Sequence, residues 1–371
     1  MQGYFTISRE LIPVEQPLLY DLYINSSGLE GTQRFVRVAR VGQALSALDL
    51  TQFHEKYNQL YLSEAQRELF MQSLFKSGAT RERGEFLKNS AVQYLEKIYR
   101  PDLTTAQLNE TLVGCRDVVE NMVDLLHDQN VDQVRGLIGS LSFHDFYTFD
   151  HSINVSMYSI LIYRMIKPQA TRQEILHAGL GGLLHDLGKI KIPTEIINNP
   201  GKLSPEQFDE IKRHPGYGSE LLSQTTVQFP DDVDATIVER VVLEHHENFD
   251  GSGYPAKLKG EQIHLMARIT SIADFFDAVT TKRSYHIPLT SGEALALMEK
   301  AAGKKIDPVI FEIFRKNCPS LPIHRGFQAQ TLPADFDPCQ PHAHLPLLQN
   351  FGKVLVMDDA RPKPPAKKRA V

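Results

Sequence analysis

The chain has 371 residues, which is enough for two ordinary domains and a further segment, since one domain commonly takes about 100–200 residues. Its composition is 42% hydrophobic and 23% charged, as in a globular protein that can bury a core. The formal net charge of -5 argues against a general nucleic-acid-binding protein, which would carry an excess of basic residues. We therefore expect no nucleic-acid partner.

The cysteines and the apolar segments indicate the cellular compartment in which we expect the protein. The cysteines match no CxxC spacing and are expected to be reduced thiols: Cys115, Cys318 and Cys339. Residues 1–13 lack the basic segment and apolar core of a signal peptide. The apolar stretch 155–166 is too short for a membrane span of about 20 residues and contains Arg164. We expect a cytoplasmic protein with no membrane span.

Residues 1–60 show strand patterns. Residues 21–25 favour a strand that runs into a Ser-Ser-Gly turn signal, and residues 34–40 place β-favouring side chains among arginines. The segment that follows has a helical pattern up to about Tyr99. We expect residues 1–100 to form a smaller mixed α+β domain that senses a signal or binds a protein partner.

Residues 101–130 contain an amphipathic helix over about 104–128. Its apolar residues recur every three or four positions: Leu108, Leu112, Cys115, Val118, Val119, Met122, Leu125 and Leu126. One interpretation is that this helix packs on its own domain. The other is that it connects two domains or two copies of the chain and relays a signal, which leaves a homodimer open.

Residues 131–318 have helical patterns throughout, interrupted by Pro- and Gly-marked loops at 192–205, 250–260 and 302–308. Strand alternation is not sustained anywhere in this region, so we expect an all-α domain. Residues 319–371 are rich in proline and end in a basic run, a composition typical of a largely disordered tail.

The chemistry is concentrated in the all-α region. His185 and Asp186 are adjacent in the run LLHDLGK, and an imidazole beside a carboxylate can reach two metal ions at once. Further candidates lie before and after this pair: His151, His214, His245, His246 and Asp274. Mixed nitrogen and oxygen ligands suit iron, manganese, zinc, nickel or cobalt rather than calcium.

Taken singly, these residues have ordinary explanations. His151 alone is typical of a partly buried helix histidine, and His245 with His246 could be a solvated pair. Asp274, however, lies in the apolar run ITSIADFF, where an unpaired buried charge would be costly. Taken together, the residues predict a metal site.

The motifs resemble those of the HD-GYP subgroup of HD phosphohydrolases. The resemblance rests on HDLGK at 185–189, on HHENFDGSGYP at 245–255 and on GKKIDP at 303–308, and it covers about residues 145–317. It implies an all-α HD-type catalytic helical bundle and a metal-dependent phosphodiesterase that opens cyclic di-GMP to pGpG, with GMP as a further product left open.

The resemblance also implies a ligand set. His151, His185, Asp186 and Asp274 would hold one ion, and Asp186 would bridge to a second ion held by His214, His245 and His246. Some relatives bind a third ion through a glutamate four residues before the first histidine. Tyr147 occupies that position here, so we expect two divalent transition-metal ions, iron or manganese before zinc, nickel or cobalt.

Two ions that share Asp186 could hold a bridging hydroxide that attacks the phosphodiester. Lys189 would neutralise phosphate charge and act in catalysis beside Asp186. By the same resemblance Tyr254 would contact guanine and Arg283 would grip phosphate. His286 stands where many relatives have the last arginine of RPYR, and an imidazole is mostly uncharged at neutral pH.

Two alternatives stay open. A metal-containing domain of low activity could act as a cyclic di-GMP receptor that signals through partner proteins. The same fold could instead act on another phosphoester such as cyclic GMP-AMP. A PilZ-like site among Arg34, Arg37 and Arg40 is not favoured, because the companion motif of that domain is missing and solvated strand arginines explain them better.

Overall fold

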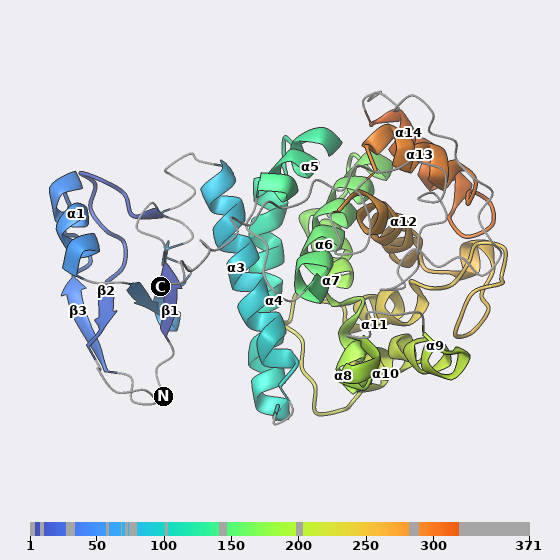
Figure 1. Cartoon of the computed structure of the whole chain (residues 1–371), viewed down its shortest axis with the longest axis horizontal. Helices are drawn as coiled ribbons and strands as arrows, with labels where there is room; N and C mark the ends of the chain where they lie inside the picture. Colours follow the sequence, from blue (N-terminus) through green and yellow to red (C-terminus); the bar gives the residue numbers. More distant parts are fainter. Residues whose placement is uncertain are drawn as a thin grey trace, which may run out of the picture.

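A computed structural model describes residues 4–7, 11–26, 34–56, 59–67, 69–70, 73, 80–100, 103–140, 147–197, 203–281 and 289–318. They form a small sheet unit at one end and a larger group of helices at the other (Figure 1). The predicted fold class, a helical bundle preceded by a smaller mixed α+β region, is confirmed. The tail predicted at 319–371 lies outside the described residues.

The sheet is antiparallel, with strand order β1-β4-β2-β3. Its strands are β1 Tyr4–Ile7, β2 Leu22–Asn25, β3 Phe35–Ala39 and β4 Leu60–Ser63. The strands expected at 21–25 and 34–40 are thus confirmed as β2 and β3. Phe5 and Leu62 are opposite each other in the register and buried, so one face of the sheet belongs to the core.

The helices follow in chain order. Their bounds are α1 Ala47–Lys56, η2 Glu64–Gln66, α3 Thr80–Ile98, α4 Thr105–Leu125, α5 Val131–Ser140, α6 Tyr147–Ile166, α7 Arg172–Leu184, η3 Leu187–Lys191, α8 Thr194–Ile197, α9 Pro205–Ile211, α10 His214–Leu222, α11 Ala235–Glu244, η4 Gly260–Gln262, α12 Leu265–Thr280, α13 Ser291–Glu299 and α14 Pro308–Lys316. The described residues of 131–318 are mainly helical as expected, although α8 lies inside the segment that the sequence marked as a loop.

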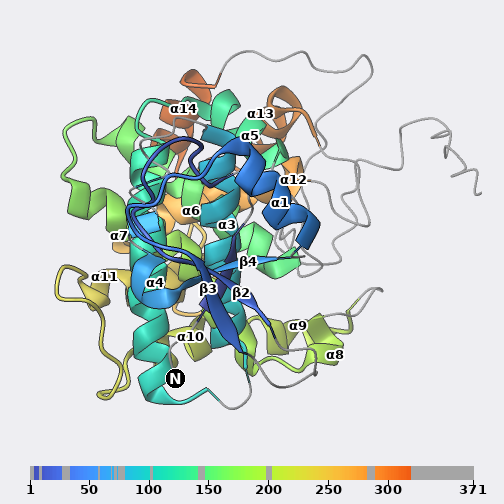
Figure 2. The ribbon, with the colours of Figure 1, turned by 90° about the vertical axis from the view of Figure 1, so that its left-hand side faces the viewer.

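Helix α4 confirms the predicted amphipathic helix. Thr104 caps it in a box with Gln107, in which each side chain accepts from the other residue's backbone N–H. All the apolar residues of the predicted stripe are buried within the chain. Helices α3 and α4 run side by side between the sheet unit and the other helices, and Figure 2 shows the sheet in front of them. The stripe therefore packs inside this chain.

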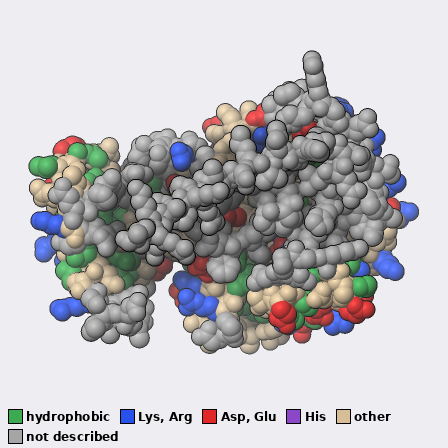
Figure 3. Space-filling model, viewed as in Figure 1, with side chains coloured by type: hydrophobic (Ala, Val, Ile, Leu, Met, Phe, Trp, Pro, Cys, Tyr) green, Lys and Arg blue, Asp and Glu red, His purple; other side chains and the backbone are tan. Residues whose placement is uncertain are grey.

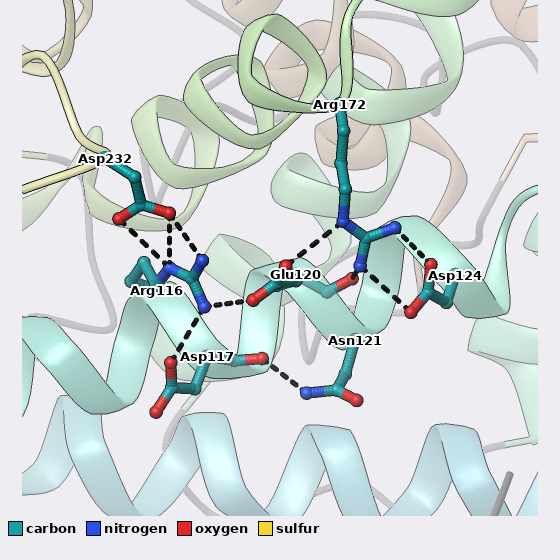
Figure 4. A network of polar contacts seen from close by, with 7 residues as sticks. All are labelled: Arg116, Asp117, Glu120, Asn121, Asp124, Arg172 and Asp232. Atoms are coloured by element: carbon teal, nitrogen blue, oxygen red, sulfur yellow. Dashed lines mark hydrogen bonds and ion pairs between the residues drawn. The ribbon is translucent and has the colours of Figure 1, made fainter. Parts of the chain in front are cut away.

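Charged contacts fasten α4 to the helices behind it (Figure 4). Arg116 of α4 donates to Asp232, which lies before α11, and also to Glu120 and Asp117. Arg172, the first residue of α7, donates through Nε to Glu120 at 3.1 Å. These contacts hold the ends of α7 and α11 against α4.

The surface carries both signs of charge. Among the side chains coloured in Figure 3, both Lys or Arg and Asp or Glu are present on that face. No helix within the described residues is long and apolar enough to span a bilayer.

Candidate metal centre

The structure brings the predicted ligands together in two groups, and the ligand atoms of each group lie within 4.8 Å of one another. One group is formed by Asp186, His214, His245 and His246, and the other by His151, His185 and Asp274. They come from α6, from the junction of α7 with η3, from the start of α10, from the end of α11 and from the middle of α12. All but His246 are buried.

Two glycines allow the close approaches that this gathering needs. A Cβ on Gly182 would lie 3.0 Å from the Cα of Ser156, so α7 can approach the backbone of α6 only without a side chain there. A Cβ on Gly188 would lie 1.9 Å from the carbonyl oxygen of His214. Any larger residue at 188 would push the start of α10, and His214 with it, away from the His185–Asp186 pair.

In the His151 group the ring is held at both nitrogens. Its Nε2 lies 2.9 Å from Oδ1 of Asp274, and its Nδ1 lies 2.7 Å from Oδ2 of Asp277. Nε2 of His185 is buried and makes no hydrogen bond to a described residue, and its ion-pair contact with Oδ2 of Asp186 is 3.3 Å long. A buried ring nitrogen left in this state fits a metal ligand.

The other group contains two ring nitrogens that face each other. Nδ1 of His214 contacts the carbonyl oxygen of Ile211 at 2.7 Å, and Nδ1 of His245 contacts that of Val242 at 2.9 Å. Because a carbonyl oxygen only accepts, each Nδ1 carries the proton and each neutral ring leaves a lone pair on Nε2. The two Nε2 atoms nevertheless lie 3.2 Å apart.

A cation between these two atoms explains the contact. Two acceptors that face each other repel unless a proton or an ion lies between them. Nitrogen ligands bind zinc at about 2.0–2.1 Å, which separates two nitrogens on one ion by about 3.0–3.4 Å. The observed spacing therefore fits a shared metal ion. Oδ1 of Asp186 lies 3.3 Å from Nε2 of His214, so a carboxylate oxygen faces the same point.

Asp186 is placed between the two groups. Its Oδ2 faces His185 and its Oδ1 faces His214, each with an oxygen-to-nitrogen distance of 3.3 Å. The carboxylate therefore offers one oxygen to each group, which is the arrangement that a bridging ligand requires.

Ionisation in the site suits metal binding. Burial lowers the pKa of His214 to about 4, and burial together with neighbouring imidazoles lowers the pKa of His245 and His246 well below the usual value. Burial alone would raise the pKa of Asp186, but Lys189 and His185 outweigh it and hold that pKa well below the usual value. Neutral imidazoles and an ionised carboxylate are the forms in which these groups bind metals.

His151 differs from the other histidines. Burial lowers its pKa, but the hydrogen bonds to Asp274 and Asp277 outweigh burial and raise the pKa to about 9. Asp274 changes in the opposite sense, because the contact with His151 lowers its pKa in spite of burial. In the absence of an ion this pair is a charged hydrogen bond, and binding a metal at Nε2 requires loss of a proton.

Sequence reasoning missed Asp277, which orients His151. Its carboxylate accepts from Nδ1 of His151, from Nδ2 of Asn154 at 2.9 Å and from Oγ1 of Thr281 at 2.6 Å. A carboxylate behind a ligand histidine fixes its tautomer and ring orientation. A signal was present, because Asp277 directly follows the apolar run that singled out Asp274.

Two predicted substrate contacts border the centre. Nζ of Lys189 lies 2.5 Å from Oδ2 of Asp186, so this lysine points into the site. The ring of Tyr254 stacks on that of His246, with centroids 4.9 Å apart. Arg283 and His286 lie outside the described residues, as does the side chain of Tyr147.

Comparison with known proteins identifies the class. Residues 156–310 match the family model of the HD domain. These residues are therefore similar to an HD domain, and the resemblance to HD-GYP proteins predicted from the motifs is confirmed for this region.

The similar curated proteins are bacterial phosphodiesterases. Cyclic di-GMP phosphodiesterase PA4108 of Pseudomonas aeruginosa is 38% identical over 180 residues, 48% of this chain and 41% of that protein. The cyclic di-GMP phosphodiesterase response regulator RpfG of Xanthomonas campestris is 40% identical over 37% of this chain and 35% of its own length. The 3'3'-cGAMP-specific phosphodiesterase 3 of Vibrio cholerae is 34% identical over 47% of this chain and 36% of its own length. The matched regions thus span less than half of these relatives.

A solved structure shares the fold over a longer stretch. Bd1817 of Bdellovibrio bacteriovorus, described as an HDG"Y"P protein, superposes with a TM-score of 0.52 over 85% of this chain and 99% of its own. Its sequence identity is 18%, so the likeness concerns the fold alone.

Proposed function

We propose that this chain is a metal-dependent phosphodiesterase that hydrolyses cyclic di-GMP to pGpG. The observation that carries the proposal is the pair of opposed Nε2 atoms of His214 and His245, 3.2 Å apart, beside a buried carboxylate. An ion there fits the donor set, and relatives with the same domain are named cyclic di-GMP phosphodiesterases.

We further propose that two ions are bound, one by each group, with Asp186 shared. The two carboxylate oxygens of Asp186 face one histidine of each group, which supports this division. Iron or manganese fits the mixture of imidazole and carboxylate ligands, and zinc, nickel and cobalt fit it as well.

The ions would supply Lewis acidity to a phosphoryl oxygen and a water molecule of lowered pKa. The chain's own residues supply the rest. Lys189 brings a positive charge to the edge of the site, where it stabilises charge that develops on phosphate. Tyr254 offers a ring or a hydroxyl to guanine beside His246. Arg283 and His286 complete the proposed phosphate contacts.

Cyclic GMP-AMP is a second candidate substrate, because three similar proteins of Vibrio cholerae are named as specific for 3'3'-cGAMP. The test is turnover of each dinucleotide by the purified, metal-loaded full chain, with separation of the linear products. We expect a higher kcat/KM for cyclic di-GMP. Faster cleavage of 3'3'-cGAMP would reassign the substrate, and binding of cyclic di-GMP without turnover would favour a receptor.

We also propose that residues 1–100 form an N-terminal regulatory domain, 101–130 a connecting helix and 131–318 the catalytic domain. Helix α3 closes the first of these parts and packs against both α4 and α6. The N-terminal region is thus in direct contact with a helix that carries a proposed ligand.

A further inference from the structure

One face of helix α3 packs against the sheet unit formed by the N-terminal strands. Phe86 packs against Phe5 of β1 and against Phe70, with ring centroids 5.9 and 4.7 Å apart. The guanidinium of Arg67 lies 3.8 Å from the centroid of the Phe5 ring and donates to Oγ of Ser90 at 2.7 Å. Burial of aromatic rings and a charged group on this face fixes α3 to the sheet unit.

The opposite face of the same turn of α3 reaches the His151 group. Nζ of Lys88 lies 3.0 Å from Oδ1 of Asp150, and both side chains are almost fully buried. Asp150 immediately precedes His151 in the first turns of α6. A buried ion pair resists separation, because breaking it leaves a charge without compensation. The pair therefore fixes the segment of α6 that carries His151 against α3.

Beyond the end of α3 lies a contact with the other group. The hydroxyl of Tyr99 donates to the backbone carbonyl oxygen of Asp186 at 3.1 Å, and its ring packs edge-on against Phe149 with centroids 5.3 Å apart. The same carbonyl oxygen accepts from the backbone N–H of Lys189 at 2.9 Å. Both lone pairs of the Asp186 carbonyl are thus used, one by η3 and one by Tyr99.

The hydrogen bond from Tyr99 matters because of the position of Asp186 in the chain. Helix α7 ends at Leu184, and Asp186 is the N-cap residue of η3, so its peptide lies at the junction of the two helices. Tyr99 comes from a part of the chain 87 residues away and fixes this peptide from outside the turn. The carboxylate proposed to bridge two ions depends on that peptide for its position.

We propose that Tyr99 and Lys88 are positioning residues of the metal centre. Tyr99 holds the backbone of Asp186, and Lys88 holds Asp150 beside His151, so α3 and the residue that follows it help to position both ligand groups. This inference rests on the proposed metal centre. Partners behind the ligands commonly change metal affinity or activity by about 10–100-fold.

The direct test is Tyr99→Phe, which removes one hydroxyl and keeps the ring on Phe149. Its matched control is Tyr94→Phe, because Tyr94 lies on the face of α3 that contacts the guanidinium of Arg67. Full-length proteins freed of metal are titrated with Mn²⁺ against a competing chelator. We expect Tyr99→Phe to bind Mn²⁺ about 10-fold or more weakly and to unfold at the temperature of the control. Equal affinity in wild type and Tyr99→Phe would overturn the role of Tyr99.

A second set of variants tests Lys88 without leaving a lone buried charge. Lys88→Met combined with Asp150→Leu removes both charges, and Lys88→Arg keeps the pair. We expect the double variant to lose about 10-fold in Mn²⁺ affinity and Lys88→Arg to retain most of it. Two results would overturn the role of Lys88. One is a folded double variant that binds Mn²⁺ with wild-type affinity. The other is a Lys88→Arg variant that loses as much Mn²⁺ affinity as the double variant. Wild type that binds no Mn²⁺ would instead overturn the metal centre itself.

Discussion

The metal centre and the arginine network of Figure 4 both gather ionisable side chains, but they balance charge differently. In the network, Arg116 and Arg172 donate to surrounding carboxylates, and the side chain of Arg172 is 49% exposed. In the centre, the side chains of Asp186 and His214 are 3% and 0% exposed, and Nε2 of His214 faces the Nε2 atom of His245.

The difference shows what each cluster needs from outside the protein. Groups near the surface can satisfy one another and keep water as a further partner. Buried ligand atoms that face one another cannot use water as a partner in this way, and burial of an uncompensated polar group is costly. The network is thus complete as it stands, whereas the side chains of the centre fit a cation that would compensate them. The three predictions that follow test this contrast, from the largest effect to the smallest.

Lys189 should affect rate more than metal content. Removing an electrostatic donor from an active site commonly costs about 10²–10³ in kcat. We expect Lys189→Ala to keep its metals and to lose kcat on that scale in a cyclic di-GMP assay. Lys191→Ala is the matched control, because Lys191 lies in the same turn and pairs with Glu220 at 2.9 Å. Turnover equal to that of the control would reduce Lys189 to a structural partner of Asp186.

Asp277 should affect metal affinity through His151. Asp277→Asn keeps the shape but replaces an acceptor oxygen by an amide group, which disturbs the bond to Nδ1 of His151. We expect the affinity for the ion at the His151 group to fall about 10–100-fold. Isothermal titration with Mn²⁺ measures the loss, and Asp209→Asn, at an exposed position of α9, is the control. A titration curve like that of the control would show that His151 needs no orienting carboxylate.

The network should affect stability only slightly. Partly exposed ion pairs contribute about 1 kcal/mol or less, and salt weakens them further. We expect Arg172→Met to lower the free energy of unfolding by about that amount at low salt and by less at high salt, with unchanged metal content. Urea unfolding at two salt concentrations measures it. Loss of metal in this variant would contradict the separation of the two clusters.

The sequence singled out the proposed ligands because their local context was unusual. His185 and Asp186 lie in an otherwise apolar run, and Asp274 is surrounded by apolar residues that imply burial. Asp277 was missed because its partner on α6 is 126 residues away, although its apolar neighbours offered the same argument as for Asp274. The contact of Tyr99 with Asp186 depends in the same way on how helices pack, which no local pattern encodes.

For the fold as well, elements with a local sequence pattern were predicted, and elements that depend on distant contacts were not. The long helix α4 was predicted because its stripe repeats over many residues. Strands β1 and β4 were not predicted, because they are stabilised by pairing with each other across a long stretch of sequence. Helix α8 was taken as part of a loop because prolines and a glycine mark the segment 192–205 around it.

The central claim is that two ions share Asp186, and metal stoichiometry tests it most directly. The full chain and its Asp186→Ala variant are purified without oxygen and analysed for iron, manganese, zinc, nickel and cobalt per chain, with circular dichroism to confirm folding. The account predicts two equivalents in the wild type and loss of both in Asp186→Ala, whereas His246→Ala should weaken mainly one. Two full equivalents retained in folded Asp186→Ala would contradict the bridging role.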